Sequence, residues 1–257
     1  MDPTGLVARE DLLLCEDVTK IVNDEAYGSN AIVPAGDWRE LSPHELQAIF
    51  RPRTETKYWQ LVGKRQLKST TADKLMRAVG ERKETERSTP DTRNLAADAL
   101  SILLRETDTH LSFEDDLTFI GFREAAVDGP TQTVDYFADM KKPGLHLDTW
   151  DETSSENRYL SRNRICINLG NVDRYFIFLP ITVEGFRRKL PMSSRLGSNE
   201  AAKKYLATGP DMPVIAIRVK PNEFYFAPTE NLIHDGWCPD VSAVDRTFTI
   251  LGRFIPR

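Results

Sequence analysis

The sequence predicts a mainly β fold with helices in its N-terminal part. From about residue 136 onward, short apolar or alternating runs are separated by Gly, Pro and Asn, which is the pattern of strands joined by turns. Before that point, apolar residues recur at the spacing of amphipathic helices. The chain has 257 residues, of which 40% are hydrophobic, so one domain is expected. We expect a mainly helical part at 1–135 and a β-rich core at 136–257.

Three segments of the first part are predicted to be helices. Residues 91–105 are the clearest, because they carry an apolar stripe at helical spacing and begin at Asp91, a favourable N-cap residue. Residues 43–50 follow Ser42, which is also a favourable cap, and residues 71–82 form the third segment.

Seven segments of the second part are predicted to be strands: 145–150, 164–169, 175–181, 214–219, 223–226, 232–234 and 246–254. Because almost no helix separates them, they favour a double-stranded β-helix, or jelly roll, whose two sheets protect each other's edges and whose mouth holds a ligand. Residues 182–213 interrupt the series. This long, basic segment predicts a lid-like insertion, and a solvated loop is the other interpretation.

Composition excludes several classes of protein. A net charge of -5 gives no general electrostatic reason to bind nucleic acid or an anionic membrane. The N-terminal residues do not resemble a secretory signal and no stretch is long enough to span a bilayer, so a soluble, cytoplasmic protein is expected. Cys15, Cys166 and Cys238 are too widely spaced for a disulfide framework or a zinc cluster, and we expect reduced thiols, with Cys166 in the core.

His146, Asp148 and His234 form a candidate metal site. In a strand, residues i and i+2 point to the same face, so the His-x-Asp pair can present both ligands on one side. His234 follows Asp148 by 86 positions (234 minus 148), which is far enough for intervening strands to fold back. Two imidazoles and one carboxylate match the facial triad of non-haem iron(II) oxygenases, which leaves the opposite face of the metal open.

The order His-x-Asp, strands, His and then Arg on the last strand resembles the iron(II)- and 2-oxoglutarate-dependent oxygenase superfamily. The resemblance covers roughly residues 144–257. It implies a cupin-like barrel in which His146, Asp148 and His234 hold iron(II), with 2-oxoglutarate and dioxygen as cosubstrates.

The resemblance also implies that an Arg shortly after the distal His binds the far carboxylate of 2-oxoglutarate. Arg246 follows His234 by 12 positions (246 minus 234) and is the preferred anchor. Its guanidinium suits a carboxylate through two parallel hydrogen bonds. Arg253, which alternation places on the opposite face of the strand, is the competing anchor. A third interpretation is that Arg246 only pairs with Asp240 or Asp245 at the surface.

Other residues bear on the reaction and the substrate. Related halogenases lack the carboxylate ligand, so the presence of Asp148 favours hydroxylation over halogenation. Arg164 begins the strand after the His-x-Asp pair and is a candidate for binding a substrate carboxylate, with a surface salt bridge as the alternative. Trp150 and Trp237 flank the ligand segments and are candidate cavity walls, although aromatic residues at strand ends more often serve simple core or rim packing.

The resemblance, together with these patterns, implies a hydroxylase that acts on an unactivated carbon of a small polar substrate. An amino acid or an amino-acid-derived metabolite of secondary metabolism, free or tethered to a carrier protein, is the leading expectation, and a homodimer remains open. The alternatives are a cupin-like metal or small-molecule binding protein and a metal-dependent isomerase. His44 and His110 are assigned to surface or capping roles, and residues 114–116 to a solvated turn.

Overall fold

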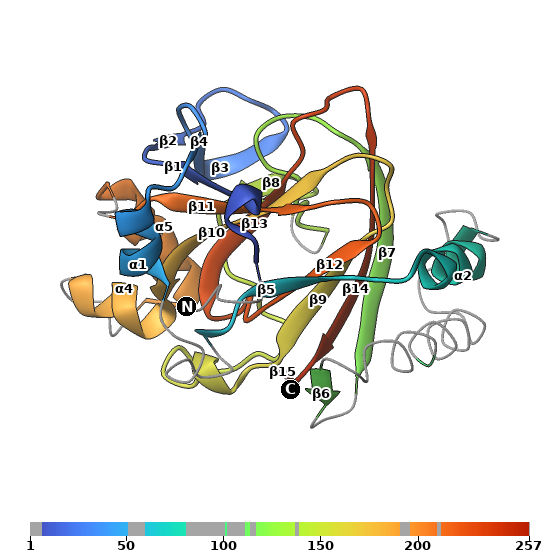
Figure 1. Ribbon diagram of the computed structural model, residues 1–257. Coiled ribbons are helices and arrows are strands. Elements are labelled where there is room, and N and C mark those ends of the chain that lie inside the picture. The colour runs from blue at the N-terminus through green and yellow to red at the C-terminus, as the bar shows by residue number, and fades with distance from the viewer. Residues whose placement is uncertain are drawn as a thin grey trace.

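The protein is described by a computed structural model, in which the described residues are 7–50, 60–80, 101, 111–113, 117–136, 139–190, 196–209 and 212–256. Strands dominate this part of the chain, which confirms the prediction of a mostly β fold. Two five-stranded sheets form the body of the molecule, and a three-stranded and a two-stranded sheet accompany them (Figure 1).

Sheet 1 is the five-stranded sheet that carries the candidate metal site. Its strands, in spatial order, are β13 (Leu232–Trp237), β10 (Arg174–Thr182), β11 (Val214–Val219), β1 (Leu12–Cys15) and β4 (Arg39–Glu40). All neighbouring strands are antiparallel. The segment around His146 pairs with the other edge of β13 through an isolated antiparallel bridge to His234.

Sheet 2 is the second five-stranded sheet, and all its neighbouring strands are also antiparallel. Its order is β5 (Gly63–Gln66), β12 (Glu223–Ala227), β9 (Asn163–Asn168), β14 (Val244–Gly252) and β7 (Thr118–Ala126). The smaller sheets join β2 (Val18–Lys20), β3 (Tyr27–Pro34) and β8 (Lys142–Gly144), and β15 (Phe254–Pro256) with β6 (Leu111–Phe113).

The helices confirm two of the three predicted segments. Helix α1 (Pro43–Ile49) begins at a capping box in which Ser42 and Glu45 satisfy each other's backbone N–H groups. Helix α2 (Ser69–Gly80) matches the predicted segment 71–82. The remaining predicted segment, 91–105, lies outside the described residues except for Ser101. The described part also contains α4 (Val183–Lys189), α5 (Ser198–Ala207) and the 3-10 turns η1 (Arg9–Asp11) and η4 (Arg158–Leu160).

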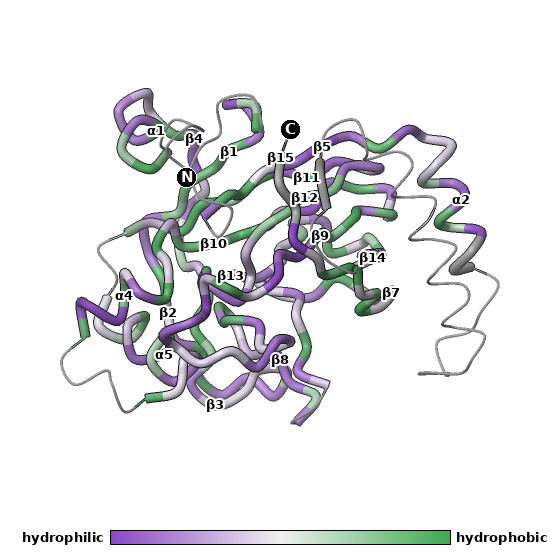
Figure 2. Tube along the Cα trace, turned by 90° about the horizontal axis from the view of Figure 1, so that it is seen from below, coloured by the Kyte–Doolittle hydropathy of each residue, from purple (hydrophilic) through white to green (hydrophobic). Residues whose placement is uncertain are grey.

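Apolar side chains fill three layers. The central layer lies between the two sheets and includes Phe176 and Ile217 from sheet 1 and Tyr225 from sheet 2. Helices α4 and α5 cover the outer face of sheet 1, and α2 covers the outer face of sheet 2, so these helices lie on opposite sides of the molecule (Figure 1). Figure 2 shows β1 and β10 as largely hydrophobic, whereas α2 and α4 carry long hydrophilic stretches.

The prediction that residues 1–135 are mainly helical is wrong for the described part of that segment. Strands β1 to β7 all fall within it. The apolar run Leu12–Cys15 becomes a strand because it pairs with β11, whose residues lie about 200 positions later in the chain. The sequence around a strand does not show which distant segment the strand will pair with, so local periodicity did not predict β1.

The expected lid-like insertion at 182–213 is also wrong. Its described residues form α4 and α5, which pack on the outer face of sheet 1. Val183, Phe186 and Leu206 are buried there, while Arg188 is exposed. The many basic residues of this segment suggested a solvated loop, although an apolar stripe beside a charged face is the pattern of a surface helix.

Two further observations concern membrane spans and thiols. Among the described residues, no helix combines the length and the apolar character that a bilayer crossing requires. All three cysteines are buried and free, which confirms the expectation of reduced thiols.

A buried cluster of charged residues joins sheet 2 to sheet 1. The Lys64 Nζ atom on β5 lies 2.7 Å from Asp11 Oδ2 and 2.7 Å from Glu223 Oε2. The other oxygen of Asp11 accepts a hydrogen bond of 2.8 Å from Arg218 on β11. Asp11 therefore bridges sheet 2 to sheet 1, and Lys64 shares the compensation of its charge with Arg218 and with Lys220, whose Nζ atom lies 3.7 Å away.

Replacing Lys64 with Met should lower the free energy of unfolding by about 3–5 kcal/mol, because it leaves Asp11 and Glu223 buried without their shared cation. Urea denaturation followed by circular dichroism measures this loss. Lys74→Met on the exposed face of α2 is the matched control and should change stability by no more than about 0.5 kcal/mol. Equal stability of the two variants would contradict a fastening role for Lys64.

Candidate metal centre

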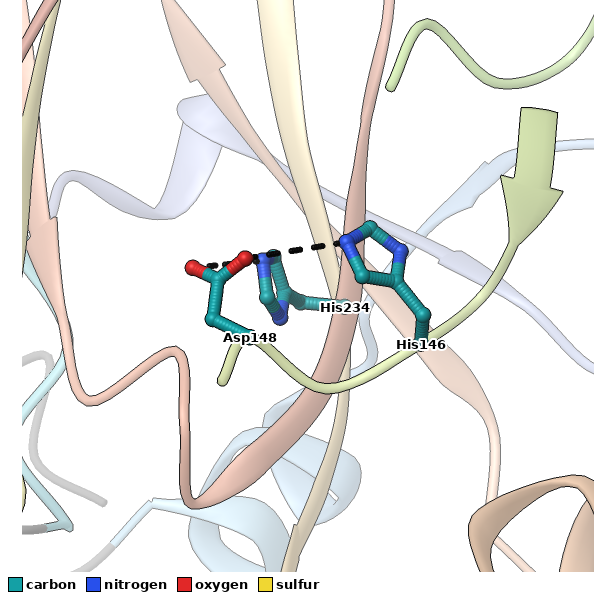
Figure 3. Close-up of side chains that lie close together, drawn as sticks. All are labelled: His146, Asp148 and His234. Atoms are coloured by element: carbon teal, nitrogen blue, oxygen red, sulfur yellow. Dashed lines mark ion pairs between the residues drawn. The ribbon is translucent and has the colours of Figure 1, made fainter. Parts of the chain in front are cut away.

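The structure brings together the three residues that the sequence singled out as metal ligands. One ligand atom from each of His146, Asp148 and His234 lies within 4.8 Å of the others. The Nε2 atom of His146 is 3.8 Å from Asp148 Oδ1, and that of His234 is 3.6 Å from Asp148 Oδ2. Figure 3 shows the three side chains pointing toward one another from the His146 segment and strand β13.

Backbone pairing fixes the relative position of the two histidines. The His146 N–H donates to the His234 carbonyl at 3.0 Å, and the His234 N–H donates to the His146 carbonyl at 2.8 Å. Residues that face each other in this way send their side chains to the same side of a sheet. The two ring centroids are consequently only 4.8 Å apart.

The backbone of Asp148 is held by a buried arginine. Arg158 donates to the Asp148 carbonyl at 2.9 Å, and its charge is balanced by Glu230 at 2.7 Å. The Asp148 N–H donates to the Thr229 carbonyl at 3.2 Å. Asp148 lies two residues beyond His146, the residue that is bridged to His234. These hydrogen bonds, and not strand pairing, therefore orient Asp148.

The hydrogen bonds of the rings direct both Nε2 atoms at the centre. His146 Nδ1 lies 2.7 Å from the Gly144 carbonyl, and His234 Nδ1 lies 3.0 Å from the Leu232 carbonyl. A carbonyl oxygen only accepts, so each Nδ1 carries a hydrogen and Nε2 remains for a metal. His234 Nε2 and Asp148 Oδ2 are buried without a hydrogen-bond partner. Unsatisfied buried atoms that face each other fit a site built around a cation.

Charges around the triad shift its pKa values in opposite directions. Burial opposes ionisation of His146, but the carboxylates of Asp148 and Asp235 outweigh it and raise the pKa of His146 to about 10. Burial lowers the pKa of His234 to about 4. Burial also opposes ionisation of Asp148, yet the Arg164 guanidinium and the two histidines hold its pKa well below the usual range. In the metal-free protein, the proton of the triad therefore resides on His146.

Two charged residues adjoin the triad and a third lies farther along the same face of sheet 1. The sequence analysis missed two of these three. Arg164, a predicted substrate residue, lies 3.3 Å from Asp148 Oδ2. Asp235, which directly follows His234, places Oδ2 3.5 Å from His146 Nδ1. Arg174 is on the same face of sheet 1 as His234 and is buried. A charged residue at the start of an apolar strand is a signal that could have identified Arg174.

The predicted 2-oxoglutarate anchors lie elsewhere. Arg246 pairs with Glu124 at 2.6 Å, and it shares its strand face with Phe248, which packs toward α2. The structure therefore places Arg246 on the outer face of sheet 2 and does not bring it to the triad. The Arg253 guanidinium donates to the Leu160 carbonyl at 3.1 Å.

The two tryptophans are also displaced from their expected positions. Trp237 stacks on Trp38 with ring centroids 5.0 Å apart, on the face of β13 opposite to His234. Trp150 is exposed. Neither residue is brought to the triad, and of the predicted substrate residues only Arg164 contacts a ligand.

Comparisons of the chain with models of protein families, with curated proteins and with solved structures found no match. The residues of the site themselves define it as a cluster of two histidines and one aspartate on a β framework.

Metal affinity should rise by about tenfold per pH unit between roughly pH 6 and pH 8, because a metal must displace the proton that His146 retains below its pKa of about 10. His234, with a pKa of about 4, is already neutral in this range and adds no second proton. Competition titration with Zn²⁺ measures the slope, and calorimetry in buffers of different ionisation enthalpy counts the proton. An affinity independent of pH would show that metal-free His146 is neutral.

Proposed function

We propose that this protein is a non-haem iron(II)- and 2-oxoglutarate-dependent dioxygenase that hydroxylates a small polar substrate. The observation that carries the proposal is the convergence of His146 Nε2, His234 Nε2 and Asp148, with both Nδ1 atoms occupied by carbonyl groups. This donor set suits iron(II) and leaves coordination positions open for cosubstrates. Its burial between two sheets favours chemistry that must exclude water.

The strand pairing supports a jelly-roll assignment. A jelly roll is a long antiparallel hairpin rolled into two sheets, so its first strand pairs with its last, its second with the one before last, and so on inward. Here β7 pairs with β14, the His146 segment with β13, β9 with β12 and β10 with β11. Successive members of this series also alternate between the two sheets, apart from the central pair β10 and β11, which both belong to sheet 1.

In this proposal His146, Asp148 and His234 hold iron(II). Bound iron(II), together with 2-oxoglutarate and dioxygen, supplies the oxidising power for hydroxylation. The side chains of the protein orient the ligands and keep water away. Phe176, whose ring centroid lies 5.7 Å from that of His234, provides an apolar wall on one side.

Arg174 is the residue that we propose as the anchor for the far carboxylate of 2-oxoglutarate, in place of Arg246. Its guanidinium lies against Gly236, where a Cβ would be only 2.7 Å from Nη2. Gly236 follows His234 by two residues, or about 6.6 Å of strand, on the same face. That offset suits a short dicarboxylate with one end at the metal. Arg174 Nε is also buried without a hydrogen-bond partner, although Asp245 lies 3.3 Å away.

Arg164 supports a substrate that carries a carboxylate, such as an amino acid. In the metal-free site its charge is balanced by Asp148 at 3.3 Å. A metal bound to Asp148 would compete for that carboxylate, which leaves Arg164 in need of another anion in a poorly solvated position. Its Nε atom is buried and has no hydrogen-bond partner. An amino acid or amino-acid-derived metabolite meets this requirement.

The first test is anaerobic titration of the iron(II)-loaded protein with 2-oxoglutarate. We expect a weak visible absorption band that is absent from the Asp148→Ala and His234→Ala proteins, because each loses a ligand at the centre. His44→Ala, which alters an exposed histidine, should retain the band. Iron binding without a band would instead favour a metal-binding protein or an isomerase that needs no oxygen.

Arg174→Gln should raise the concentration of 2-oxoglutarate needed for half-saturation by about 10- to 100-fold, because a charge-assisted hydrogen bond to a carboxylate contributes about 1.5–3 kcal/mol. The same titration measures this shift while the iron affinity is monitored separately. Arg246→Gln is the control, since it removes an arginine that pairs with Glu124 on the outer face. A shift in the Arg246→Gln protein alone would identify Arg246 as the anchor.

A further inference from the structure

We infer that Asp235 is a positioning residue of the metal centre, which holds His146 with Nδ1 protonated and Nε2 directed at the metal. The inference rests on the proposed metal site and adds a residue beyond its three ligands. Asp235 directly follows His234 on β13 and is completely buried. A carboxylate in such a position requires a partner of its own.

One oxygen of Asp235 is satisfied by backbone groups. Oδ1 accepts hydrogen bonds from the N–H groups of Gln132 at 3.2 Å, Thr133 at 3.0 Å and Gly236 at 2.6 Å. These contacts attach the segment before β8 to strand β13. An amide oxygen could accept the same three bonds, so they do not explain why the side chain is a carboxylate.

The second oxygen provides that explanation. Asp235 Oδ2 is buried without a hydrogen-bond partner and lies 3.5 Å from His146 Nδ1. The same Nδ1 lies 2.7 Å from the Gly144 carbonyl, so its hydrogen faces two acceptors. A negative charge beside Nδ1–H fixes the tautomer and makes Nε2 a stronger donor to a metal. If Asn replaced Asp235, its amide N–H group would face the Nδ1–H group of His146, and two donors cannot form a hydrogen bond.

The surrounding segment keeps this carboxylate away from water. Thr131 and Gln132 are buried, and Lys142 on β8 forms an ion pair of 2.5 Å with Asp128. Lys142 precedes Gly144, whose carbonyl binds His146, by two residues, so this ion pair joins the segment that holds Asp235 to the strand that holds His146. The low dielectric of this enclosure strengthens the effect of the Asp235 charge on His146.

The test is the affinity of the full-length protein for Co²⁺, measured by competition with a chromophoric chelator. Asp235→Asn should bind Co²⁺ about 10- to 100-fold more weakly than the wild type, as expected when an outer partner of a ligating histidine is lost. Asp128→Asn is the matched control. It makes the same chemical change in the same segment and weakens the contact with Lys142, yet leaves Asp235 beside His146. Its affinity should stay within about twofold of the wild type.

The outcomes separate this inference from the proposed function. A wild-type protein that binds no Co²⁺ would overturn the metal centre and the inference together. Equal affinities of the wild type and Asp235→Asn would overturn the inference alone, and so would an equal loss in both variants, because that loss would reflect the segment rather than the charge.

A second measurement does not depend on folding of the Asn variant. Nitrogen chemical shifts of the wild-type protein with Zn²⁺ bound and its histidines labelled with ¹⁵N report which ring nitrogen carries the hydrogen. We expect His146 to bind Zn²⁺ through Nε2 with Nδ1 protonated. Coordination through Nδ1 would show that Asp235 does not hold the ring in the inferred tautomer.

Discussion

The antiparallel bridge between His146 and His234 is the constraint on which the site depends. The two residues are 88 positions apart (234 minus 146), and two backbone hydrogen bonds place them directly opposite each other. Because paired residues share a face of the sheet, this backbone contact alone brings two imidazoles within reach of one metal. The third residue of the triad, Asp148, lies just beyond this bridge. Its backbone is held in place by hydrogen bonds with Arg158 and Thr229.

Burial explains why so many charged residues surround the triad. Asp148 and Asp235 are nearly or fully inaccessible to solvent, and an isolated carboxylate in such a position is strongly unfavourable. Each has therefore acquired a cation or several backbone N–H groups, namely Arg164 for Asp148 and three amides for Asp235. The resulting network balances the buried charges of the metal-free site, in which His146 retains a proton.

The sequence predicted the cluster of His146, Asp148 and His234 because residue type and spacing indicate it, but it did not predict on which face of its strand Arg246 lies, because that depends on register. His-x-Asp and a distant His can be recognised from residue type and spacing alone. Whether Arg246 faces the triad depends on the pairing of β14 with β9 and β7, which puts it on the outer face beside Glu124. Arg174 escaped notice for the same reason, since its partner Asp245 comes from another strand and 71 positions later (245 minus 174). Strand β1 was missed because its partner β11 is equally remote.

The site and the hydrophobic core share one interior, so packing and chemistry are coupled in this fold. Sheet 1 supplies His234 and Arg174, while sheet 2 supplies Arg164, and the apolar layer between the two sheets sets the distance between them. Phe176 belongs to that layer: it stacks on Tyr225 with centroids 4.2 Å apart and also lies beside His234. A change in its volume would move the ligands relative to the arginines, because a close-packed interior transmits such a change instead of absorbing it. The residues that keep the two sheets apart therefore also set the separation of Arg164 on sheet 2 from His234 and Arg174 on sheet 1.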